Sequence, residues 1–112
     1  MEENIIKIAT DYWRLYALSA KMANNLDVTE TNKFNNQLRY FLKSLQNNLG
    51  QCGFSIVDLV GQDFDVGMAA NAINIDDFNS NDELIVEQMI EPLIMKDGVI
   101  KKQAIVKLSK KG

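Results

Sequence analysis

The spacing of apolar residues changes at Gly50 and Gly53, and this change constrains the fold more than any other feature of the chain. Before it, apolar residues recur at steps of three and four, which places their side chains on one face of a helix. That face comprises Phe34, Leu38, Phe41, Leu42, Leu45 and Leu49. Beyond Gly53, short β-branched runs alternate with turn residues. We therefore expect an α+β chain, with a helical part over residues 1–52 and a small, mostly antiparallel β domain over residues 53–112.

A first helix is predicted over residues 3–25, because an earlier apolar stripe has the same helical spacing. Its members are Ile5, Ile8, Ala9, Tyr12, Trp13, Tyr16, Ala20, Ala23 and Leu26. Glu2 and Glu3 would stabilise the positive end of this helix, and Asn24 and Asn25 can supply its end. Side-chain acceptors at residues 29–32 predict the cap of the second helix, so the two helices should form an antiparallel hairpin.

The apolar stripe of the first helix is wider than one partner helix can cover. Its aromatic residues crowd one region, and burying them requires either the β domain or a second copy of the hairpin. The residues alone leave both arrangements open. We expect a homodimer, with an interface that comprises Tyr12, Trp13, Tyr16, Phe41 and Leu45.

In the β domain, strands are predicted over residues 54–60, 72–75 and 84–90, and Pro92 should end the third strand or confine it to an edge. Asp97-Gly98 is the strongest hairpin signal in the chain. In the last strand, Ala104, Val106 and Leu108 should face inward and Lys107 outward.

The chain of 112 residues contains no histidine and one cysteine, Cys52. Histidine metal sites, histidine general bases and Ser-His or Cys-His nucleophile pairs are therefore excluded, and Cys52 should be an inert or buried thiol. The apolar stretches are far shorter than the about 20 residues that cross a bilayer, and the first residues lack the basic start of a signal peptide. We expect a cytoplasmic protein without a membrane partner.

Charge is segregated along the chain. Residues 44–95 contain nine acidic residues and no basic ones, whereas residues 96–112 contain six lysines and one aspartate. An acidic middle segment repels phosphate backbones, so nucleic acid is a poor partner. The basic end either offsets the acidic segment within the fold, which is the more usual role, or docks a partner.

Two clusters of acidic residues resemble functional sites. Asp63, Asp65 and Gly67 resemble part of a calcium loop, but a third ligand and the final glutamate are missing. An Asx turn made by Asp65, with Phe64 in the core, is expected instead. The carboxylates within residues 76–83 predict a solvated loop or a docking rim rather than an acid–base pair. No catalytic residue, metal or cofactor is expected.

Several elements between residues 34 and 109 carry a family resemblance through their order and spacing. Along the chain they are the leucine-rich helix ending at Gly53, Phe64-Asp65, Ala72-Ile73, the Asp97-Gly98 turn and the final Ala-Ile-Val-Lys-Leu strand, residues 104–108. Together they resemble the second half of the GrpE family, the nucleotide exchange factors of DnaK-type chaperones. In that family, a leucine-rich helix precedes a Phe-Asp-Pro-like element, a His-x-Ala-Val-like strand, a hairpin and an Arg-x-Ala-x-Val-x-Val-like strand.

The resemblance implies a dimeric four-helix bundle built from two hairpins, and a β domain that grips the ATPase domain of a DnaK-type chaperone. Val99 matches a contacting arginine of the family, Leu108 matches a contacting valine, and Ile90, Ile100 and Lys101 are their neighbours. The long N-terminal stalk of the family has no counterpart in this sequence, so functions that depend on the stalk should be missing.

Two departures from the family pattern affect the implied partner. Ala70 and Asn71 stand where the family has its histidine, and Val99, Lys101 and Lys102 stand where it has arginines. The resemblance implies a non-enzymatic exchange factor that binds the open ATPase cleft better than the closed one and so promotes ADP release. The departures favour an alternative, a GrpE-derived adaptor or assembly subunit without exchange activity.

Overall fold

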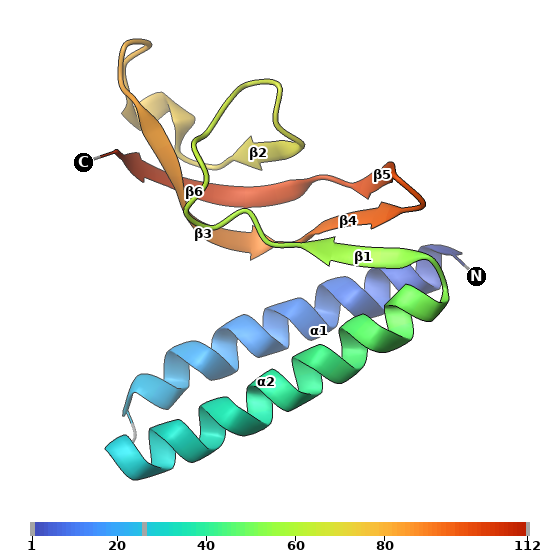
Figure 1. Ribbon diagram of the computed structural model, residues 1–112. Coiled ribbons are helices and arrows are strands. Elements are labelled where there is room, and N and C mark those ends of the chain that lie inside the picture. The colour runs from blue at the N-terminus through green and yellow to red at the C-terminus, as the bar shows by residue number, and fades with distance from the viewer. Residues whose placement is uncertain (1, 26, 112) are drawn as a thin grey trace. The chain divides into compact units, whose positions relative to one another are not determined.

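The computed structural model describes residues 2–25 and 27–111, which form two compact units, residues 1–55 and 56–112. The first contains the helices α1 (Glu2–Met22), η1 (Ala23–Asn25) and α2 (Val28–Gln51), and strand β1 (Phe54–Val57) crosses the boundary. The second contains β2 (Ala70–Ala72), η2 (Ile75–Asp77), β3 (Leu84–Glu91), β4 (Leu93–Lys96), β5 (Val99–Lys102) and β6 (Ala104–Lys110). This order, visible in Figure 1, confirms an α+β fold with an N-terminal helical hairpin.

The helices α1 and α2 run antiparallel, side by side, as Figure 1 shows. Helix α2 begins earlier than the sequence indicated, because Asp27 caps it and accepts a hydrogen bond from the Glu30 N–H at 2.8 Å. The expected cap at residues 29–32 is therefore wrong, and the Thr31 hydroxyl instead donates to the Ala23 carbonyl at 2.9 Å. Leu26, part of the predicted stripe, lies outside the described residues.

The end of α2 also differs in detail from the prediction. Gly50 lies inside the helix, which continues to Gln51, and the chain then turns at Gly53 with a φ of 82°. Positive φ values favour glycine because a side chain would clash with the backbone there. The change of period therefore occurs at Gly53 alone. In the part of the chain that the structure describes, neither helix is long and apolar enough to cross a membrane.

The strands form two three-stranded sheets, with the orders β1-β4-β5 and β2-β6-β3. Strand β6 lies between β2 and β3; it pairs parallel with β2 and antiparallel with β3, while β4 and β5 pair antiparallel. The predicted strand over residues 54–60 is too long, because the Asp58 carboxylate accepts the Val60 N–H at 3.0 Å and bends the chain. The strand predicted over residues 72–75 instead covers Ala70–Ala72.

The inward face of β6 is as predicted. Ala104, Val106 and Leu108 are buried and Lys107 is exposed. Inward and outward side chains do not alternate regularly along β3. Register shifts against β6 bring Val86 and Met89 to the buried face and leave Ile90 only half-buried. Strand β3 ends immediately before Pro92, which confirms the role predicted for that proline.

Asn74 extends the β2–β6 pairing beyond the end of β2. Its side-chain amide donates to the Leu108 carbonyl and its side-chain oxygen accepts the Leu108 N–H, both at 2.9 Å. One side chain thus satisfies both main-chain groups of a buried residue in the central strand. The sequence offered no specific sign of this role.

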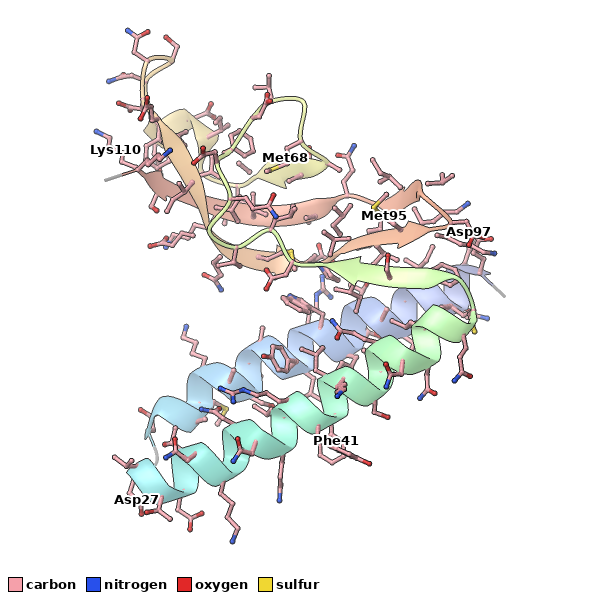
Figure 2. All side chains as sticks on the ribbon, in the orientation of Figure 1. Asp27, Phe41, Met68, Met95, Asp97 and Lys110 are labelled. Carbon is pink, nitrogen blue, oxygen red and sulfur yellow. The ribbon has the colours of Figure 1, made fainter. Side chains whose placement is uncertain are left out.

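The hairpin between β4 and β5 forms where the sequence predicted it. Asp97 and Gly98 have φ values of 50° and 83°, the two successive positive values of a type I′ turn. Lys96 pairs with Val99 across this turn, and Figure 2 shows Asp97 at its tip.

Candidate protein-binding surfaces

An apolar groove of about 290 Å³ lies between the two helices of the hairpin. Its lining residues are Tyr12, Leu15, Tyr16 and Ser19 from α1 and Leu38 and Phe41 from α2. Three of the five residues predicted for dimerisation, Tyr12, Tyr16 and Phe41, therefore meet at one place. Trp13 is buried and Leu45 is half-buried, and neither of them lines the groove.

Exposed apolar side chains continue this groove along α1. They are Ile8, Leu15, Leu18 and Met22, and we refer to them together with Phe41 as the outer apolar face. Leu15 is 61% exposed and Phe41 is 54% exposed; the Phe41 side chain, labelled in Figure 2, projects away from α2. Because the expected stripe was centred on the aromatic residues, Leu15, Leu18 and Met22 were missed. The step of seven from Ile8 to Leu15 to Met22, typical of helices that pack on helices, could have identified them.

The aromatic side chains beside the groove contact one another in two pairs. The ring centroids of Trp13 and Tyr16 lie 5.6 Å apart, and those of Tyr40 and Phe41 lie 5.7 Å apart in an edge arrangement. Burial raises the pKa of the Tyr12 hydroxyl, and the neighbouring Tyr16 raises this pKa further. The Tyr12 side chain therefore stays neutral near pH 7, so it adds no charge to an otherwise apolar surface.

A second candidate surface lies on strand β5. Val99 is 56% exposed, and Ile100 and Lys101 beside it are also exposed. Leu108, predicted to contact a partner, is only 2% exposed, so its side chain belongs to the core of the second unit. Its inward position on β6 explains this, because alternate residues of a strand face opposite sides. Ile90 is half-buried on β3.

The acidic segment and the basic end of the chain interact within the second unit. Lysines 102, 107, 110 and 111 form ion pairs with Glu91, Glu87, Asp82 and Asp63, respectively. These pairs agree with the prediction that the basic end offsets the acidic segment within the fold.

The remaining sequence candidates are structural. The Asp65 carboxylate accepts the Gly67 N–H at 3.0 Å, which confirms the Asx turn, although Phe64 is only half-buried. The Asp82 carboxylate similarly accepts the Asn79 N–H at 2.9 Å. Cys52 is exposed where α2 ends, so the alternative of a buried thiol is wrong.

Comparisons of this chain with protein-family models, curated proteins and solved structures give no match.

Proposed function

We propose that the chain is a GrpE-like nucleotide exchange factor that binds the ATPase domain of a DnaK-type chaperone through strand β5 and promotes ADP release. The observation that carries this proposal is the pair of exposed apolar residues, Val99 and Ile100, directly after a type I′ turn. They occur in a small β unit that follows a helical hairpin, the order of elements on which the resemblance rests. Exposed apolar side chains on a rigid hairpin are suited to fill a pocket of a partner protein.

The proposed mechanism requires no bond chemistry. An ATPase domain exchanges between closed and open clefts, and a protein that binds the open form better shifts the population toward it. The affinity of the ATPase domain for ADP then falls by the factor by which the bound protein prefers the open cleft. A protein with equal affinity for both forms would leave the ADP affinity unchanged. Binding through a short, fixed hairpin suits this role, because a rigid surface discriminates between two shapes of its partner.

We further propose that the protein acts as a homodimer in which two helical hairpins pair through the outer apolar face. Ile8, Leu15, Leu18 and Met22 leave apolar side chains exposed along almost the whole of α1, and the apolar groove adds those of α2. Exposed apolar surfaces on two adjacent helices are usually covered by further helices. A second copy supplies an identical surface and gives a four-helix arrangement.

Replacing Val99 and Ile100 together by serine should weaken binding to the ATPase domain by about tenfold or more, because two apolar side chains at the centre of the contact are lost. The measurement is biolayer interferometry with an immobilised DnaK-type ATPase domain in its nucleotide-free and ADP-bound forms. The unsubstituted chain should bind the nucleotide-free form more tightly. Val66→Ser is the matched control, since Val66 is 94% exposed and lies in the same unit, between β1 and β2 rather than on β5.

Equal binding by the Val99→Ser/Ile100→Ser variant and the unsubstituted chain would contradict the role of β5. Circular dichroism separates this outcome from misfolding, because both substituted side chains are exposed and the fold should survive.

The position of Val99 also favours a second candidate function. An uncharged residue stands where the resemblance places an arginine, and the exposed Asn71 stands in the segment where it places a histidine. A changed surface of this kind fits a GrpE-derived adaptor that binds a protein other than a chaperone. The test is co-purification with the unsubstituted chain and with a Val99 variant. If a protein other than a DnaK-type chaperone is recovered, and its recovery depends on Val99, the adaptor function is supported.

A further inference from the structure

The β unit contains a second apolar groove, which the proposed function does not use. It has a volume of about 290 Å³, and its apolar lining consists of Phe64, Val66, Ile75 and Leu84. Val66 is 94% exposed and Ile75 is 42% exposed. Phe64 and Leu84 are half-buried and form the floor. We refer to these four residues as the loop groove.

An acidic hollow of about 300 Å³ adjoins the loop groove and shares Phe64, Leu84 and Asp82 with it. Asp63 and Glu83 add two more carboxylates to its lining. The lining of this hollow thus contains three carboxylates, those of Asp63, Asp82 and Glu83, and one basic side chain, that of Lys111. Among residues 2–25 and 27–111, no carboxylates gather closely enough to hold a metal ion. The excess of carboxylates over basic side chains in the lining of the hollow is suited to organic cations.

The chain itself shows how a cation sits in this hollow. Lys111 lines it and places its Nζ 3.2 Å from Asp63 Oδ1, while the Lys110 Nζ lies 3.9 Å from Asp82 Oδ2. Figure 2 shows Lys110 near the end of β6. About half of the Lys111 side chain and more than half of the Asp63 side chain are exposed. Exposed ion pairs contribute little to stability, so another cation can replace Lys111 without disturbing the fold.

We propose that the loop groove and the acidic hollow together bind a short, unstructured segment of a partner protein in which an apolar residue is followed by lysines or arginines. The apolar side chain lies between Val66 and Ile75, and the cations pair with Asp63, Asp82 and Glu83. In the free protein Lys111 lines the acidic hollow and Lys110 pairs with Asp82, and both lysines are displaced from their carboxylates on binding. This surface is independent of the chaperone contact on β5.

The probe is a fluorescein-labelled peptide, Gly-Leu-Phe-Lys-Lys-Lys, titrated with the full chain at low salt and followed by fluorescence anisotropy. Saturable binding is expected. Peptides with glutamates in place of the lysines, or serines in place of Leu-Phe, should bind about tenfold more weakly or worse. Raising the salt concentration to about 0.3 M should weaken binding of the lysine peptide, because exposed charges are screened.

Substitutions locate the binding site. Val66→Ser combined with Ile75→Ser should weaken binding of the lysine peptide by about tenfold, whereas Val99→Ser should leave this binding unchanged. Lys111→Gln should strengthen binding several-fold, because a competing cation is removed. Lys107→Gln removes the same charge from the Glu87 pair outside both hollows and is the matched control.

The proposal would be overturned by no saturable binding of the lysine peptide, by equal binding of the glutamate peptide, or by equal effects of Lys111→Gln and Lys107→Gln. Loss of peptide binding in Val99→Ser but not in the Val66 and Ile75 variant would also overturn it. Failure of the chaperone contact would leave all of these results unaffected, since that contact is measured separately with the ATPase domain.

Discussion

Asn74→Ala is expected to lower the free energy of unfolding by about 2–4 kcal/mol. The substitution removes both hydrogen bonds, each of 2.9 Å, that the Asn74 side chain makes with the main chain of Leu108. The Leu108 side chain is buried, and its N–H and C=O would lose their partner in a poorly solvated place. An unsatisfied buried polar group costs more than the net gain from a hydrogen bond, so two of them make a large effect. Urea denaturation followed by circular dichroism measures it.

Asn71→Ala is the matched control for this prediction. Asn71 is also an asparagine beside β6, but its side-chain amide donates to the Gln103 side chain at 3.1 Å in an exposed position. Its loss should change the stability by about 0.5 kcal/mol or less. Equal destabilisation by the two substitutions would show that the contact with Leu108 does not anchor β6.

Leu15→Glu combined with Phe41→Glu should convert a dimer into a monomer, with a dissociation constant raised by about 100-fold or more. Both residues line the apolar groove of the helical hairpin, and both are exposed in a single copy. In the proposed dimer the new carboxylates would be buried without a cationic partner, whereas in the monomer they remain in water. Sedimentation equilibrium over a range of concentrations measures the dissociation constant.

Val28→Glu is the control, because Val28 is also apolar and exposed but lies at the start of α2, outside the lining of the groove. This substitution should leave the dissociation constant of the dimer within about twofold of the value for the unsubstituted chain. A monomeric unsubstituted chain, or a double variant that still dimerises, would contradict the pairing through the outer apolar face.

The general architecture could be predicted because local signals agreed with the tertiary structure. The helical spacing of α2 and the type I′ turn at Asp97-Gly98 depend on neighbouring residues alone, and both occur in the structure. The same holds for the inward face of β6, where Ala104, Val106 and Leu108 alternate with outward residues. The actual start of α2 also had a local signal, since Asp27 stands three residues before Glu30, the spacing of a capping box.

Features that depend on contacts between distant segments could not be predicted. The pairing of Asn74 with Leu108 joins residues 34 positions apart, and nothing in the local sequence distinguishes Asn74 from the other asparagines. The register shifts of β3 against β6 bring Met89 rather than Ile90 to the core, because a bulge reverses the alternation. The loop groove likewise brings Phe64 and Val66 beside Ile75 and Leu84.

The residues predicted to bind a partner differ in their exposure. Val99 and Ile100 are exposed on β5, as a partner contact requires, whereas Leu108 is buried. The resemblance assigned a contact to Leu108 from its position in a motif, but the alternation of β6 already placed that side chain inward. The cytoplasmic location, the homodimer and the chaperone partner stay predictions.

The central claim is tested most directly by the rate at which labelled ADP leaves a DnaK-type ATPase domain from the same organism, measured by stopped-flow fluorescence with and without a stoichiometric amount of this protein. We expect release to accelerate by about tenfold or more; a tenfold lower affinity for ADP would correspond to a preference for the open cleft of about 1.4 kcal/mol. An unchanged release rate with every DnaK-type ATPase of that organism would contradict the account.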